Sequence, residues 1–248
     1  MLGLFADWCN FYFPHQQARI LPGMPQTKRI LPPKGIADGL KQKLKESSLE
    51  EELRTRLHRA ISWLNCAEMQ AEELDLRFLS LWISFNSCYA IELTEAESKT
   101  ERVKFKQFIS SLVKHDTEGK IFNLLWEKFS GPVRLLIKNK FIFKPFWDYQ
   151  RGEIQDWETA FDKANTDATS YLSAYKIDGL LHIILDRLYV LRNQLFHGGA
   201  TFRSKVNRDQ VKDGAAILGL LLPIMIDIIM NHPEEDWGRL MFPVVKED

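Results

Sequence analysis

The sequence has little cysteine, and its cysteines are not arranged for a disulfide framework or a structural zinc site. The three are Cys9, Cys66 and Cys88, and no two have Cys-x-x-Cys spacing. Small disulfide-rich secreted domains and zinc fingers carry cysteines at short, paired spacings. Both classes are therefore excluded, and we expect a cytoplasmic protein in a reducing compartment.

The chain also lacks an excess of charge of either sign, because 33 Lys and Arg balance 33 Asp and Glu. A protein that coats nucleic acid by net charge alone is therefore excluded, although a local basic patch is not.

Long apolar runs are missing too. The longest covers residues 215–226, ends at Asp227 and falls short of the roughly 20 residues of a membrane helix. Asp7 interrupts the apolar N-terminal segment, which does not resemble a signal peptide. We expect no membrane partner.

Helical periodicity dominates what is present, and no stretch shows the sustained alternation of a strand. The leucines at 181, 185, 188, 191 and 195 form one such helical stripe. Hydrophobic residues make up 45% of the chain, which is enough for a core and excludes disorder. The sequence therefore predicts an all-α fold, a helical bundle with extra helices inserted and an irregular N-terminal arm.

The predicted domain boundaries follow from prolines, aromatics and one capping pattern. Residues 1–46 are rich in both proline and aromatic residues and read as an irregular arm, packed on the body or on a neighbouring subunit. Ser48 and Glu51 have the spacing of a capping box, which predicts a helix from about residue 47. Residues 47–248 then form a single helical domain, and residues 100–176 supply the inserted helices, with breaks near Gly119, Gly131 and Pro145.

Several apolar and histidine positions allow more than one interpretation. The last long helix is predicted over residues 208–231. Its apolar residues belong either to the core or to a dimer seam; they are Leu218, Leu221, Leu222, Met225 and Ile229. Three histidines, His58, His115 and His232, stand alone in the sequence, and we expect them to be structural or exposed.

Polar side chains gather at the end of the helix predicted over residues 178–197. Asn193 and His197 are four residues apart and lie about 40° from each other round the helix axis. Arg192 and His197 are five apart, which places them about 140° from each other. Within one helix, Arg192 and His197 therefore do not both contact the same small group, such as one phosphate. Two copies related by a two-fold axis could bring both pairs to one phosphate.

These residue types suit cleavage of RNA. A neutral histidine such as His197 can accept the proton of a ribose 2′-hydroxyl. The fork-shaped guanidinium of Arg192 can hold a phosphate and stabilise the charge that develops on its oxygens. Asn193 can orient the imidazole or bind a phosphate oxygen. No carboxylate cluster indicates a metal, and we expect no cofactor. The alternative is that Arg192 and His197 only cap the helix, since its dipole favours cations there.

Two further groups of residues could assist. Arg203, Lys205 and Arg208 follow the glycines and could track an RNA backbone, or they belong to a solvated loop. Asn86 and Tyr89 lie on an apolar helix predicted over residues 75–93. As buried polar groups they need partners, so they could hydrogen-bond beside the motif helix or satisfy each other.

The segment RNQLFHGG, residues 192–199, resembles the signature of the HEPN superfamily, all-α domains often found as prokaryotic RNases. The following GATFRSKVNRDQVKDGA and the earlier RFLSLWISFNSCYA resemble a branch of standalone or defence-linked HEPN proteins. Gly199 stands where toxins paired with a nucleotidyltransferase antitoxin often carry tyrosine.

The resemblance implies a homodimer with a composite cleft, in which two Arg-x4-His motifs meet. It implies a metal-independent endoribonuclease that leaves a 2′,3′-cyclic phosphate, with Arg192 and His197 catalytic and Asn193 beside them. The expected partners are an RNA substrate, a second copy of the chain, and an antitoxin or other defence-system protein. The alternative is a non-catalytic HEPN-like module that binds RNA, a nucleotide or a partner protein.

Overall fold

Helices supply the regular structure of residues 35–89 and 101–244, the parts of the chain that the computed structural model describes. Within these two ranges no strand is present, so the all-α prediction is confirmed. The helices are α2 (Ile36–Glu46), α3 (Glu51–Met69), α4 (Leu74–Tyr89), α5 (Glu101–His115), α6 (Lys120–Lys128), α7 (Arg134–Ile137), α8 (Lys144–Gln150), α9 (Glu158–Ser173), α10 (Ile177–Phe196) and α11 (Arg208–Asn231). A π-helical turn, η2 (Phe129–Val133), and a 3-10 turn, η3 (Lys140–Ile142), join the shorter helices.

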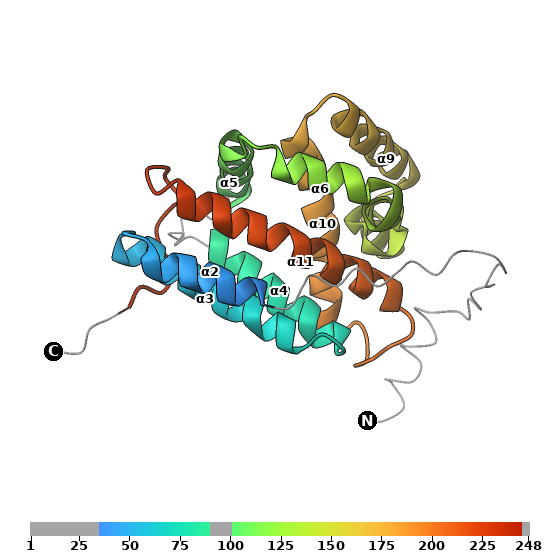
Figure 1. Ribbon diagram of the computed structural model, residues 1–248. Coiled ribbons are helices and arrows are strands. Elements are labelled where there is room, and N and C mark those ends of the chain that lie inside the picture. The colour runs from blue at the N-terminus through green and yellow to red at the C-terminus, as the bar shows by residue number, and fades with distance from the viewer. Residues whose placement is uncertain (1–34, 90–100, 245–248) are drawn as a thin grey trace. The chain divides into compact units, whose positions relative to one another are not determined.

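Helix α11 is the centre of the bundle. It lies between α2–α4 on one side and α5 and α6 on the other, and α10 crosses behind it (Figure 1). The most extensive helix contacts are those of α4 with α3 and with α11. Nearly all of the buried apolar side chains belong to one continuous core, which runs through both sides of α11. Hydrophobic burial at this central helix therefore holds the two groups of helices together.

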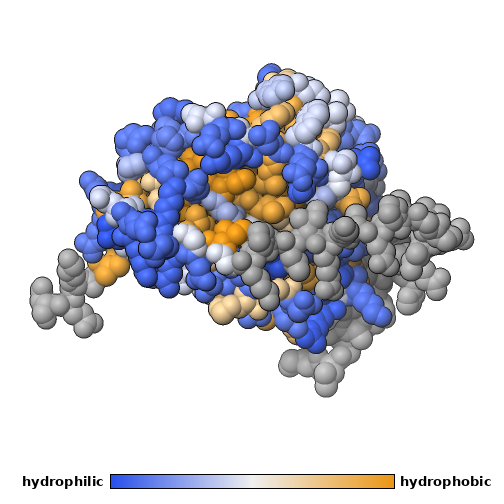
Figure 2. Space-filling view, in the orientation of Figure 1, coloured by the Kyte–Doolittle hydropathy of each residue, from blue (hydrophilic) through white to orange (hydrophobic). Residues whose placement is uncertain are grey.

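The apolar residues of α11 belong to the core. Leu218, Leu221, Leu222 and Ile229 are completely buried, and Met225 is almost so. By length and composition alone α11 could also cross a membrane, but 67% of its most apolar stretch is buried inside the protein. A row of apolar side chains near Leu220 and Ile224 is only partly buried, and Figure 2 shows apolar surface where α11 passes between α2 and α6.

The first helices differ from the prediction. Residues 36–46, assigned to the irregular arm, form helix α2, which buries Ala37, Leu40 and Leu44. The predicted capping box is wrong as well: the N-cap of α3 is Glu50, and no side chain caps it. Arg54 instead reaches back to the carbonyl oxygens of Ser47 and Leu49. The prediction for residues 1–34 lies outside the described residues.

The region between α5 and α9 breaks where the sequence indicates. Gly119 has φ +64° and precedes α6, and Gly131 has φ −114° and ψ −114° inside η2. Near Pro145, η3 ends at Ile142 and α8 begins at Lys144. Pro145 lies in the first turn of α8, where a proline costs no hydrogen bond.

Candidate functional site

A glycine pair ends helix α10 at the Arg-x4-His motif. Gly198 has φ +70°, a left-handed conformation that only glycine adopts without strain. The backbone N–H of Gly199 donates to the carbonyl oxygen of Gln194 at 2.7 Å, and that of Gly198 donates to Leu195 at 3.3 Å. These two bonds define a Schellman motif, with His197 as the C-cap residue. The Gly-Gly sequence therefore stops the helix directly after the histidine.

Arg192 is held against its own helix and has no carboxylate partner among the described residues. Its Nη1 donates to Asn193 Oδ1 at 2.9 Å, and its guanidinium carbon lies 4.2 Å from the ring centroid of Phe196. Its Nε is buried without a hydrogen-bond partner. The aromatic ring and the amide orient the guanidinium, and its charge is not neutralised.

His197 lies apart from this cluster on the exposed end of the helix. Within residues 35–89 and 101–244, its side chain makes no hydrogen bond or ion pair. Asn193 engages Arg192 rather than the imidazole. The geometry of a single chain thus agrees with the helical arithmetic, which separates Arg192 from His197 around the axis.

Arg203 and Arg208, predicted to contact RNA, pair with carboxylates at the start of α4. The guanidinium of Arg203 binds Glu73 with two nitrogens, and its backbone N–H donates to Asp75 Oδ2 at 2.7 Å. Arg208 Nη2 donates to the same Asp75 oxygen at 3.0 Å. The hydrogen bond from Arg203 lowers the pKa of Glu73. These arginines therefore fasten the loop to α4, and their charges are largely offset.

Lys205, by contrast, is exposed and pairs with no described residue. The loop is also tied to the motif helix by Gln194, a residue that the sequence analysis missed. Gln194 Nε2 donates to the carbonyl oxygen of Phe141 at 2.6 Å, and its Oε1 accepts from Asn207 Nδ2 at 3.3 Å. The position of Gln194 between Arg192 and His197 was the only signal in the sequence. It did not identify the partners, Phe141 and Asn207, which are 53 and 13 positions away.

Tyr89 does not lie beside the motif. Its ring packs on Phe105 at 5.3 Å, and Phe105 in turn contacts the ring of His182 at 5.7 Å. Because His182 precedes Arg192 by ten positions on α10, this contact is roughly 15 Å from the motif along the helix. On the same helix α4, Asn86 has a buried Oδ1 without a partner among the described residues. Among the described hydrogen bonds, none joins Asn86 to Arg192 or His197.

Large apolar side chains are exposed around the motif. Tyr189 and Phe196 are seven residues apart, on the helix face that also carries Arg192, and they are 51% and 50% exposed. In the loop that follows, Phe202 and Val206 are exposed to a similar degree. Grouped exposed aromatics of this kind mark surfaces that contact other molecules.

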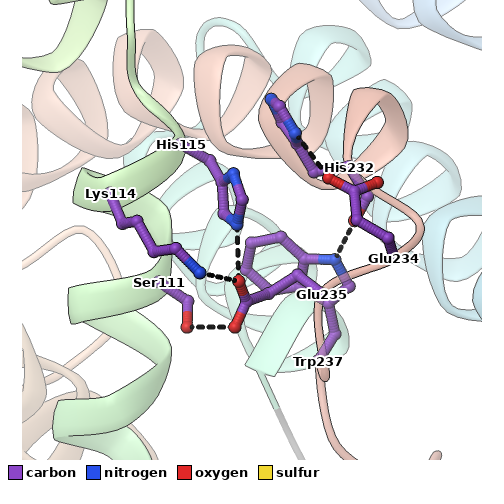
Figure 3. A network of polar contacts seen from close by, with 7 residues as sticks. All are labelled: Ser111, Lys114, His115, His232, Glu234, Glu235 and Trp237. Carbon is purple, nitrogen blue, oxygen red and sulfur yellow. Dashed lines mark hydrogen bonds and ion pairs between the residues drawn. The ribbon is translucent and has the colours of Figure 1, made fainter.

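A second polar cluster, which the sequence analysis missed, joins the end of α5 to the turn after α11 (Figure 3). The side chains of His115, His232 and Glu234 each offer a ligand atom, and these atoms all lie within 4.8 Å of one another. His115 and His232 stand alone in the sequence, but they are neighbours in the fold. The pattern His-x-Glu-Glu at 232–235 was a weak signal, and nothing in the sequence pointed to His115 as its neighbour.

Comparison of the chain with family models, curated proteins and solved structures finds no match.

Proposed function

We propose that the protein is a metal-independent endoribonuclease of the toxin or antiphage-defence type. Its active site is composite: the Arg192 and His197 side chains of two chains face each other across a two-fold axis. The resemblance of residues 192–199 to the HEPN signature suggests this class, and the surroundings of Arg192 support it.

The observation that carries the proposal is the contrast between Arg192 and its neighbours. Arg203 and Arg208 are paired with Glu73 and Asp75, as surface arginines commonly are. Arg192 is oriented by Asn193 and Phe196 instead, beside an exposed aromatic surface, and no carboxylate of the described residues pairs with it. A preoriented guanidinium without a protein anion is suited to bind a phosphate.

The proposed chemistry needs no ion. His197 of one chain accepts the proton of the ribose 2′-hydroxyl, and the 2′-oxygen attacks phosphorus. The bond from phosphorus to the 5′-oxygen breaks, and the second His197 donates a proton to the leaving oxygen. Arg192 stabilises the charge on the non-bridging oxygens. The products are a 2′,3′-cyclic phosphate and a 5′-hydroxyl. Lys205 holds the adjacent backbone by charge.

Labelled RNA incubated with the purified full-length protein in EDTA tests the proposal. We expect cleavage that leaves a cyclic phosphate and that falls at least ~100-fold in His197→Ala and in Arg192→Ala. Matched controls are His58→Ala and Arg134→Ala, whose side chains are exposed on α3 and α7. Circular dichroism would verify that each variant is folded.

Two outcomes would contradict the proposal. Full activity in the Arg192→Ala, His197→Ala double variant would remove the motif from catalysis. RNA binding without cleavage by the wild type, retained in His197→Ala, would favour the alternative of a non-catalytic binding module.

A further inference from the structure

We propose that His115, His232 and Glu234 form a binding site for a transition-metal ion of the zinc class. The site joins the C-terminal end of α5 to the turn that follows α11. It is independent of the proposed nuclease site. The loop after the Arg-x4-His motif leads to the first residue of α11 and the metal site follows its last residue, and these 24 residues span roughly 36 Å.

The ligand atoms are already close to the spacing that such an ion requires. His232 Nδ1 and Glu234 Oε1 are 3.0 Å apart. Two ligands that each lie 2.0–2.1 Å from a tetrahedral ion are roughly 3.3 Å from one another. The third ligand atom, from His115, lies within 4.8 Å of both. A small rotation of the side chains is therefore enough to close the site.

The backbone and a tryptophan hold the ligands in place. His232 and Glu234 belong to one turn, in which the N–H of Glu235 donates to the His232 carbonyl oxygen. Trp237 Nε1 donates to that same oxygen at 2.8 Å. The imidazole of His115 stacks on that of His232, with 4.2 Å between ring centroids. This stacking restrains the orientation of both imidazole rings.

Glu235 orients His115 as a supporting carboxylate does in known metal sites. His115 Nε2 lies 2.5 Å from Glu235 Oε2, and Ser111 and Lys114 also donate to this carboxylate (Figure 3). Three side chains thus hold this carboxylate in place beside the ring of His115. A histidine that donates from Nε2 presents an unprotonated Nδ1 to a metal.

The distribution of charge also separates the two carboxylates. Lys114 neutralises Glu235. Within the described residues, by contrast, no lysine or arginine pairs with Glu234, which contacts His232 and is 64% exposed. Glu234 is thus left as an accessible anionic ligand. Three protein ligands leave a fourth position for water or another group.

Calorimetric titration of the untagged full-length protein with Zn²⁺, together with Co²⁺ absorption spectra, tests the site. We expect one ion per chain at this site and tetrahedral Co²⁺ bands. Glu234→Gln and His232→Gln should each weaken binding at least ~10-fold. His58→Gln, an exposed histidine on α3, is the matched control and should bind as the wild type does.

Thermal unfolding provides a second measurement. A metal ion that binds only the folded protein raises the midpoint temperature of unfolding as the concentration of free Zn²⁺ increases. This rise should be lost in Glu234→Gln. This variant should fold normally because its side chain is exposed. Absence of stoichiometric binding in the wild type, or unchanged affinity in both Glu234→Gln and His232→Gln, would overturn the proposal.

Discussion

At the scale of single residues, Arg187 shows how this protein buries a cation that no described carboxylate hydrogen-bonds. Its side chain is 3% exposed, and its guanidinium carbon lies 4.0 Å from the ring centroid of Phe143 and 5.5 Å from that of Phe161. Nε and Nη2 have no hydrogen-bond partner among the described residues. Burial lowers the pKa of Arg187 to about 10, so the charge persists at neutral pH.

The balance of these effects predicts that the charge of Arg187 is dispensable. Two unsatisfied donor nitrogens cost about 1–3 kcal/mol each, and a desolvated cation–π contact returns about 2 kcal/mol. Arg187→Met keeps the packing and removes the charge, so the free energy of unfolding should stay unchanged or rise by about 1 kcal/mol. Arg187→Ala leaves a cavity and should lower it by about 2–3 kcal/mol. Urea unfolding measures both; a loss above ~2 kcal/mol in Arg187→Met would show that the charge itself stabilises.

Asp213 on α11 should make stability depend on pH. Burial, and to a lesser extent Asp209, raises its pKa from 3.8 to about 6. The folded state therefore binds more protons than the unfolded state between these values, so stability falls as pH rises through this window. Asp213→Asn should be more stable than the wild type by about 1 kcal/mol at pH 7, allowing for solvent screening. The difference should vanish near pH 4. A constant difference at both pH values in urea unfolding would refute this assignment.

At the scale of elements, Gly214 lies where α11 packs tightly against side chains of α4 and α10. A Cβ atom there would lie 3.0 Å from side-chain atoms of Leu188 and Phe78, and 3.1 Å from Leu191. Alanine favours a helix over glycine by about 1 kcal/mol, but overpacking a core costs about 1–3 kcal/mol. Gly214→Ala should therefore lower the free energy of unfolding by about 1 kcal/mol. Gly39→Ala in α2 meets no atom within 4 Å and should raise it by a similar amount. Stabilisation by both substitutions would contradict the tight junction.

The elements that the sequence predicted well are those with local signals. Periodicity and the Gly-Gly stop defined α10 to within a residue, and α11 was predicted with its observed ends, Arg208 and Asn231. Helix α2 was missed because prolines and aromatics dominated the reading of residues 1–46, although Leu40 and Leu44 form a helical pair that packs on the core.

The site was less predictable, because its decisive contacts are tertiary. The helix geometry of Arg192 and His197 followed from their spacing. The pairing of Arg203 with Glu73 joins residues that are 130 positions apart, so the basic loop resembled an RNA-binding surface in the sequence. The contact of His115 with Glu235 spans 120 positions and has no local pattern to reveal it.

At the scale of the whole molecule, the proposed active site is incomplete in one chain. Arg192 and His197 lie at an exposed end of α10, with Tyr189 and Phe196 exposed on the Arg192 face. The α11 residues of the other seam considered are buried in the core and cannot contact a second chain; they are Leu218, Leu221, Leu222, Met225 and Ile229. The dimer surface that we propose is therefore the exposed face of α10 with the loop that follows it.

Mixed dimers test this arrangement directly. Two different affinity tags allow purification of dimers that contain one wild-type chain and one His197→Ala chain. If each chain cleaved RNA on its own, such dimers would keep about half of the wild-type activity; a composite site that needs both imidazoles loses more than half. Mixed dimers with His58→Ala should keep full activity, which controls for the tags and the exchange. Activity at one half, or cleavage by a protein that light scattering shows to be monomeric, would place a complete site within each chain. Such a result is hard to reconcile with a helix that separates Arg192 from His197 by about 140°.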